Sequence, residues 1–220
     1  MDSTIRIGLV DDHILLRDAL GAAIDGFVDC RVTLLASNGK ELISQLQDNA
    51  PPQLLILDVN MPELGGYETA RWLREHCPNI PILILTMYDS EFMMIRLLQL
   101  GVRGFLKKDI HPSELRNAIK STMTTGYYYS GSTTVKIAKL LQHGEANVPV
   151  LNTVNLTENE IQFLRLASTE MTYKEISAEM KISPRTVDNY RDSLFVKLHV
   201  KSRVGLVLFA IENGIVVIEY

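Results

Sequence analysis

The sequence predicts an α/β fold, a five-stranded doubly wound parallel sheet, followed by a small all-α domain. Up to about residue 125, short apolar runs alternate with longer amphipathic stretches, whereas from about residue 154 only helical patterns remain. A chain of 220 residues is long enough for two domains that each bury a core. We therefore place one domain at 1–125 and the other at 154–220, with a tether at 126–153.

The expected elements of the first domain follow one another as five strand and helix pairs. The strands are expected at 5–10, 31–36, 53–58, 81–86 and 104–106, and the helices at 13–25, 39–49, 66–76, 90–100 and 112–124. Five such units indicate a parallel sheet covered on both faces, with the flavodoxin-like strand order 2-1-3-4-5. Ligands of such sheets bind at the carboxyl ends of the strands.

The region 126–153 is rich in glycine, serine and threonine, although its run TVKIAKLL would also suit a short helix. Helices are then expected at 157–169, 174–180, 184–197 and 201–213. Ser183 before Pro184 is a strong helix start, and a short helix, a tight turn at 181–183 and a longer helix have the spacing of a helix-turn-helix.

Composition excludes several protein classes. Apolar residues at 46% and charged residues at 22% argue against disorder and fibrous repeats. The apolar run 204–211 is too short to cross a bilayer, and the first ten residues lack a secretory signal, so we expect a cytoplasmic protein without a membrane partner. Cys30 and Cys77 are expected to be reduced thiols. Despite a net charge of −4, positions 181–203 hold six basic and two acidic residues, a candidate nucleic-acid footprint.

Polar residues stand where the predicted strands end. Asp11 and Asp12 follow the first strand, Asp58 ends the third, Thr86 ends the fourth and Lys108 follows the fifth. Crowded carboxylates repel one another unless a cation neutralises them, and Mg²⁺ fits when a phosphoryl group is also bound. The pattern favours Asp58 as a nucleophile for phosphorus, with Lys108 and Thr86 contacting the incoming oxygens. Taken singly, these residues also suit turns, helix caps and solvated surface.

The helix expected at 184–197 has a buried stripe and a polar face. The stripe consists of Val187, Tyr190, Leu194 and Leu198, and the opposite face of Arg185, Asn189, Asp192 and Val196. Arginine suits guanine and asparagine suits adenine in the major groove. Phosphate contacts are expected from Arg191, Lys197, Lys201 and Arg203, with Lys174 and Thr172 adding to them. Asp188 and Asp192 would repel phosphate unless they accept a hydrogen bond from cytosine, and an amphipathic protein-binding helix remains an alternative.

Dimerisation would double these contacts on a two-fold DNA site. The helix expected at 201–213 carries an apolar stripe of Val204, Val207, Leu208 and Ile211. That stripe suits either pairing of two copies or packing in the core.

The motifs LVDDH, LILDVNMP, ILTMYD and GVRGFLKKD resemble the receiver domain of bacterial two-component response regulators. The tail from LTENE to NGIV resembles a LuxR-type helix-turn-helix, and together the two parts resemble the NarL/FixJ family. The resemblance implies that Asp58 accepts phosphate from a sensor histidine kinase. It implies Mg²⁺ ligation by Asp12, Asp58 and the backbone carbonyl of Asn60, with Asp11 acting indirectly. It also implies a switch pair, Thr86 and Phe105, and favours Lys108 over Lys107 as the pocket lysine.

The resulting hypothesis is a phosphorylation-controlled transcription factor, not an enzyme, that binds double-stranded DNA as a homodimer when phosphorylated. Phosphate would add a charge of about −1.5 to −2 and shift the surface formed by the fourth helix, fifth strand and fifth helix. A Mg²⁺-dependent phosphohydrolase would need a general acid two residues after the nucleophile, where Asn60 stands. A phosphorylation-gated RNA-binding or protein-binding output is the other alternative.

Overall fold

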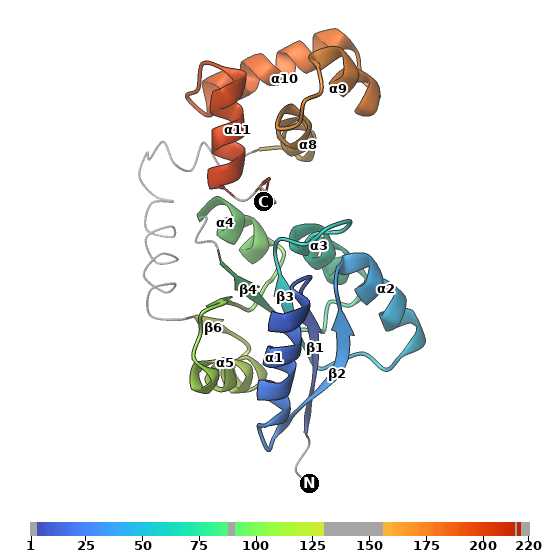
Figure 1. Cartoon of the computed structure of the whole chain (residues 1–220), viewed down its shortest axis with the longest axis vertical. Helices are drawn as coiled ribbons and strands as arrows, with labels where there is room; N and C mark the ends of the chain where they lie inside the picture. The colour runs from blue at the N-terminus through green and yellow to red at the C-terminus, as the bar shows by residue number, and fades with distance from the viewer. Residues whose placement is uncertain (1–3, 88–90, 130–155, 214, 217–220) are drawn as a thin grey trace. The chain divides into compact units, whose positions relative to one another are not determined.

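The computed structural model describes residues 4–87, 91–129, 156–213 and 215–216 (Figure 1). Contacts between Cα atoms divide the chain into two compact units. One contains the sheet and the other the C-terminal helices.

The sheet is parallel throughout and has the strand order β2-β1-β3-β4-β5-β6. Its first five strands are β1 Ile5–Val10, β2 Cys30–Ala36, β3 Leu54–Asp58, β4 Ile82–Thr86 and β5 Gly104–Lys107. The predicted order 2-1-3-4-5 is therefore confirmed. All five residues of β3 are buried, as expected for a strand covered on both faces.

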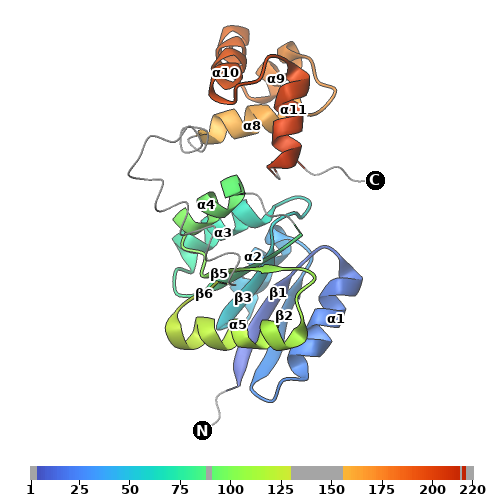
Figure 2. The same ribbon diagram turned by 90° about the vertical axis from the view of Figure 1, so that its left-hand side faces the viewer.

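Helices lie on both faces of this sheet, with α1 and α3 on opposite sides in the two views of Figures 1 and 2. They are α1 Ile14–Asp25, α2 Gly39–Asp48, α3 Gly66–His76, α4 Glu91–Gln99 and α5 Pro112–Thr125. One buried cluster joins alternate strand residues such as Leu9 and Ile56 to Ile24 of α1 and Leu115 of α5. These apolar layers hold the strand ends, where the polar residues lie, in fixed positions.

A sixth strand, β6 Tyr128–Tyr129, falls in the region where the sequence predicts a tether. Gly126 ends α5 with a φ of 91°, and Tyr128 then pairs with Gly104 of β5. A Cβ atom at Gly104 would collide with the carbonyl oxygen of Tyr128, so the pairing requires glycine there. The short helix considered for TVKIAKLL lies outside the described residues.

The C-terminal unit contains α8 Glu158–Ala167, α9 Tyr173–Glu179, α10 Pro184–Lys197 and α11 Arg203–Glu212. Capping boxes start α8 at Thr157 and α9 at Thr172. Ser183 accepts a hydrogen bond from the backbone N–H of Thr186, as predicted for the cap before Pro184. The turn between α9 and α10 includes Lys181 at a φ of 55°. The predicted helix-turn-helix spacing is confirmed.

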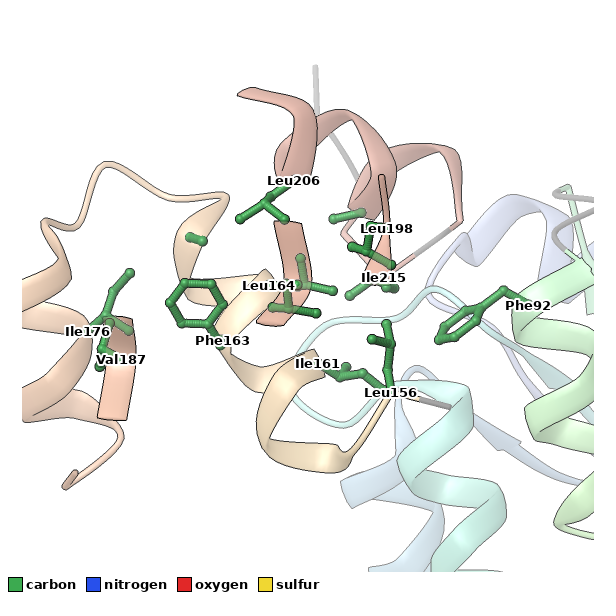
Figure 3. Close-up of a cluster of buried hydrophobic side chains, with 13 residues drawn as sticks. Phe92, Leu156, Ile161, Phe163, Leu164, Ile176, Val187, Leu198, Leu206 and Ile215 are labelled. Atoms are coloured by element: carbon green, nitrogen blue, oxygen red, sulfur yellow. The ribbon is translucent and has the colours of Figure 1, made fainter. Parts of the chain in front are cut away.

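The core of this unit is built around Phe163 and Leu164 of α8, which meet Ile176, Val187 and Leu206 from the other helices (Figure 3). The predicted stripe of α10 faces this core: Val187 and Leu194 are fully buried, Leu198 is 7% exposed, and Tyr190 packs against the cluster. Among the helices that the structure describes, none combines the length and apolarity that a bilayer span requires.

Candidate functional site

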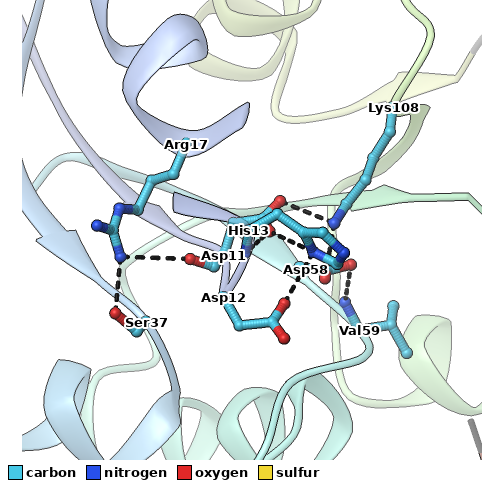
Figure 4. A network of polar contacts seen from close by, with 8 residues as sticks. All are labelled: Asp11, Asp12, His13, Arg17, Ser37, Asp58, Val59 and Lys108. Atoms are coloured by element: carbon cyan, nitrogen blue, oxygen red, sulfur yellow. Dashed lines mark hydrogen bonds and ion pairs between the residues drawn. The ribbon is translucent and has the colours of Figure 1, made fainter. Parts of the chain in front are cut away.

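The ends of neighbouring strands bring the predicted acidic residues together. Val10 at the end of β1 pairs with Leu57 of β3, which places Asp11 beside Asp58. Side-chain ligand atoms of four residues lie within 4.8 Å of one another: Asp11, Asp12, His13 and Asp58. Figure 4 shows this group together with Lys108, which follows β5. We name these five residues the acidic pocket.

The exit from β3 is fixed by Gly66 at the start of α3. Its backbone N–H donates to the carbonyl oxygen of Val59 at 2.8 Å. A Cβ atom on Gly66 would collide with the carbonyl oxygen of Asp58 and lie 2.7 Å from the Cα of Val59. Glycine at this position thus lets the first turn of α3 pack directly on the backbone that carries Asp58.

Lys108 is the cation of the acidic pocket. Its Nζ lies 2.8 Å from Asp58 Oδ2 and 2.8 Å from Asp11 Oδ2, and all three side chains are at most 5% exposed. The other oxygen of Asp58 accepts a hydrogen bond from the backbone N–H of Val59 at 2.8 Å. The structure brings Lys108 to the carboxylates, whereas Lys107 is exposed.

Burial dominates the electrostatics of Asp58. Removal from water raises the pKa of its carboxyl group to about 6, and the negative charge of Asp11 acts in the same direction, whereas Lys108 opposes the rise. Burial also acts to lower the pKa of Lys108, but hydrogen bonds to Asp11 and Asp58 outweigh it, and that pKa is raised. Asp58 is therefore ionised at neutral pH but at a cost in free energy.

Two residues of this region were not among the sequence-predicted site residues. His13 Nδ1 lies 3.0 Å from Asp12 Oδ1 and 3.2 Å from Asp11 Oδ1. Arg17, one turn further along α1, donates to Ser37 Oγ at 2.7 Å and to the carbonyl oxygen of Asp11 at 3.4 Å. The sequence signal for His13 was its position directly after the paired aspartates, and Arg17 lies in the first turn and a half of the helix that follows.

The donor set fits a hard divalent cation. Oδ1 of Asp12 is buried and accepts no hydrogen bond from the residues that the structure describes, although Nδ1 of His13 lies 3.0 Å from it. Carboxylate oxygens are ligands that Mg²⁺ and Ca²⁺ prefer, and a carboxylate oxygen of Asp12 lies within 4.8 Å of ligand atoms of Asp11 and Asp58. Asn60 is half-buried two residues beyond Asp58, and ligation by its carbonyl remains a prediction.

The predicted switch residues lie on β4, which pairs with the strand of Asp58, and on β5, which pairs with β4. Thr86 is half-buried at the end of β4, and its carbonyl oxygen accepts a hydrogen bond from the backbone N–H of Lys108 at 3.1 Å. Phe105 of β5 is 6% exposed and pairs in register with Ile84 on one side and Tyr129 on the other. A backbone shift at Thr86 would therefore move Lys108 through this hydrogen bond.

The second candidate site is the outer face of α10. Arg185, Asn189, Asp188 and Asp192 are all exposed, and Val196 is 75% exposed. The basic residues Lys174 and Lys201 on neighbouring segments are exposed as well. This is the face that the sequence predicts for DNA.

Other predicted DNA contacts have partners inside the protein. Arg203 donates to the carbonyl oxygen of Ala167, the last residue of α8, at 2.8 Å and to that of Thr169 at 2.7 Å. The hydroxyl of Thr172 takes part in the capping box of α9. Arg191 lies between Asp188 and Asp192, 2.8 Å from each. Phosphate contacts by these residues remain predictions.

Lys197 pairs with Glu160, a residue that sequence reasoning did not single out. The two side chains meet at 2.6 Å, Ser193 Oγ also donates to Glu160 at 3.3 Å, and Glu160 is 3% exposed. Burial acts to raise the pKa of Glu160, but hydrogen bonds from Lys197 and Thr157 lower it below its usual range. The pairing ties the C-terminal half of α10 to the start of α8.

The stripe predicted on the last helix is the outer face of α11. Val204 is 66% exposed and Leu208 is 54% exposed, while Val207 and Ile211 are half-buried. The core is filled by Leu206 and Ala210, which have no exposed surface.

Comparison with known proteins agrees with this two-part architecture. A model of the response regulator receiver domain matches residues 7–120, and a model of bacterial regulatory proteins of the luxR family matches residues 154–210. Response regulator UvrY of Escherichia coli K12 is 28% identical over 96% of this chain and 95% of its own length. Response regulator GacA of Pseudomonas viridiflava is 30% identical over 96% of this chain and 98% of its own length.

A solved structure of RcsB from Salmonella enterica serovar Typhimurium, bound to promoter rprA, shares the fold. Its TM-score is 0.69 at 20% identity, with 94% of this chain and 98% of that chain covered. The predicted α/β sheet with an appended all-α domain is therefore confirmed.

Proposed function

Since this chain belongs to the response regulators that join a receiver domain to a LuxR-type helix-turn-helix, we propose that Asp58 is its phosphoacceptor and that phosphorylation controls DNA binding. The observation that carries this proposal is the acidic pocket, in which buried Asp58 is held by Lys108. The phosphodonor would be a phosphohistidine on a sensor histidine kinase.

In the transfer step, an oxygen of ionised Asp58 attacks the phosphorus atom of the phosphohistidine. The new bond is Asp58 O–P, the bond that breaks is P–N, and the imidazole nitrogen leaves with the electron pair. Lys108 is placed to neutralise charge on the phosphoryl oxygens, and the hydroxyl of Thr86 would donate a hydrogen bond to one of them. A pKa of about 6 leaves Asp58 ionised, and so nucleophilic, near neutral pH.

We infer that the cation of this pocket is Mg²⁺, held by Asp12, Asp58 and the carbonyl oxygen of Asn60, with Asp11 acting through water or a second contact. When bound, it would neutralise the phosphoryl oxygens and align them with Asp58. The buried Oδ1 of Asp12 supports this assignment.

The output would be transcriptional control through α10. Arg185 and Asn189 are exposed on its outer face, where they would read guanine and adenine in the major groove. The exposed stripe of α11 would pair two copies into a homodimer on a two-fold site. A regulator that meets both a kinase and chromosomal DNA would act in the bacterial cytoplasm.

A phosphorylation assay tests whether Asp58 is the phosphoacceptor. The protein is incubated with acetyl phosphate and Mg²⁺, and phosphoryl incorporation is measured by intact mass. Wild type and Asp18→Asn should gain one phosphoryl group, because Asp18 has a side chain that is 59% exposed on α1, whereas Asp58→Asn should gain none. Wild-type stoichiometry in Asp58→Asn would show that another residue is the phosphoacceptor.

A second assay separates the rival functions. Affinity for duplex DNA and for RNA is measured against salt concentration, with and without phosphate on Asp58. DNA binding that tightens on phosphorylation supports the proposal, whereas a preference for RNA would assign the output to RNA. Turnover of phosphomonoesters would instead indicate a phosphohydrolase, although Asn60 stands where that enzyme needs an acid.

A further inference from the structure

Arg191 of α10 is surrounded by two carboxylates of the same helix. Its Nη1 lies 2.8 Å from Asp188 Oδ1, and its Nη2 lies 2.8 Å from Asp192 Oδ1. Its Nε also donates to Asp192 Oδ1 at 2.9 Å. Most donors of the guanidinium group are therefore directed at carboxylates and not at solvent.

Arg191 also contacts an aromatic ring that packs against the core of the C-terminal unit. Its Cζ lies 5.5 Å from the centre of the Tyr173 ring, and that ring stacks on Phe163 of the core at 6.1 Å. The side chain of Arg191 is 28% exposed, whereas those of Asp188 and Asp192 are 52% and 65% exposed. The cation thus lies on the protein side of the group, and the two carboxylates lie on the outside.

This order of charges changes what the outer face of α10 presents to DNA. A phosphate contact that used these three donors would require the guanidinium to leave the aspartates, and two bare carboxylates would then lie beside a polyanion. Retaining the pairing leaves Asp188, Arg191 and Asp192 with a combined charge of −1. Each carboxylate is more than half exposed and keeps lone pairs for an outside donor.

In the major groove, cytosine presents its N4 amino group as a donor and no acceptor, which a carboxylate matches. Adenine, with a donor and an acceptor side by side, is better matched by an amide such as that of Asn189. Asp188 and Asp192 are four residues apart, about 6 Å along the helix axis, or about two base-pair steps.

We propose that Asp188 and Asp192 read cytosine amino groups in the target site, and that Arg191 is a positioning residue that holds both carboxylates. The inference rests on the proposed DNA-binding function and deepens it, because it gives Arg191 a role other than phosphate contact. The target site then carries cytosine at two positions facing α10.

Base preference is the first test. Duplexes are selected from a random pool by phosphorylated full-length wild type, Asp188→Asn and Asp192→Asn, and relative affinities are measured for cytosine and thymine at each position. Each variant should lose a preference on the order of 10- to 100-fold at its own position and keep the other. If both variants keep the cytosine preference of wild type, the proposed role of the two aspartates is wrong, but the DNA-binding function stands. If the wild-type protein enriches no sequence from the pool, both this proposal and the proposed sequence-specific DNA binding are wrong.

Rescue is the second test, and it isolates Arg191. Arg191→Gln should weaken binding to the selected site by about tenfold or more, because the aspartates lose their counterion beside the phosphates. Adding Asp188→Asn and Asp192→Asn to that variant should restore affinity for random duplex DNA to the wild-type level. A phosphate contact would give no rescue and would reduce the slope of log Kd against log salt by about one.

Lys201→Gln is the matched control for a phosphate contact, since Lys201 is exposed outside α10. It should reduce the salt slope by about one and leave base preference unchanged. Equal salt slopes for Arg191→Gln and Lys201→Gln, both reduced relative to wild type, would overturn the positioning role of Arg191. Helical circular dichroism spectra identical to wild type confirm that each variant is folded.

Discussion

Asp58→Asn is expected to stabilise the sheet unit at neutral pH, and the gain should grow with pH. The folded-state pKa of Asp58, about 6, lies above the ordinary carboxyl value of 3.8. The unfolded chain therefore ionises first as the pH rises. The native state is penalised progressively between pH 3.8 and about 6, and the penalty is constant at higher pH.

The size of this penalty follows from the shift. An increase from 3.8 to about 6 corresponds to about 3 kcal/mol above both values. At about pH 5 the same relation gives a penalty of about half that size, about 1.5 kcal/mol. The oxygen of asparagine can replace only one of the two acceptors that face Lys108 and the N–H of Val59, a loss of about 1 kcal/mol at every pH. The net gain should be about 2 kcal/mol at about pH 8, about 1.5 kcal/mol more than at about pH 5.

Urea unfolding of the full chain measures this difference. The fluorescence of Trp72, the only tryptophan and a residue of α3, reports the sheet unit. Asp18→Asn is the matched control, because it makes the same substitution at a carboxylate that is 59% exposed. A difference between Asp58→Asn and wild type that stays flat or shrinks from pH 5 to pH 8 would refute the reasoning about burial.

Three further variants test the packing at Asp58, the pairing of β6 and the ion pair between α8 and α10. Gly66→Ala should cost about 1–3 kcal/mol and slow phosphoryl uptake, since its Cβ would collide with the Asp58 carbonyl; urea unfolding and intact mass measure both. Gly104→Ala should displace β6 and speed hydrogen exchange at the Tyr128 amide, and unchanged exchange would argue against the pairing. Glu160→Gln should cost about 1–3 kcal/mol in thermal unfolding at neutral pH. Because the folded pKa of Glu160 is lowered, its stabilisation is present above its ordinary value of 4.5, and the difference from wild type should shrink as the pH falls below it.

The sheet and the acidic pocket could be predicted because their signals are local. Each buried strand is an uninterrupted apolar run, and parallel strands place whatever follows them on one edge. The residues Asp11, Asp58 and Lys108 were therefore predicted to meet from their positions alone. The family resemblance added which of Lys107 and Lys108 would face Asp58.

The partners of the basic residues depend on long-range contacts and could not be predicted in the same way. Lys197 meets a glutamate 37 positions earlier, and Arg203 meets a carbonyl 36 positions earlier. The sixth strand has only two residues, and its pairing depends on the missing side chain of Gly104. Charge counts and periodicity contain neither kind of information.

These internal partners change the electrostatic argument for DNA binding. Of the six basic residues between 181 and 203, Arg191, Lys197 and Arg203 are engaged with carboxylates or carbonyl oxygens of the protein. Fewer cations are left to release counterions from DNA, so non-specific affinity of one copy should be low and its salt dependence shallow. Low affinity of single copies would make dimerisation an effective switch, because two linked half-sites gain affinity that neither copy has alone. A phosphate that favours pairing through α11 would then control DNA binding without altering any contact of α10.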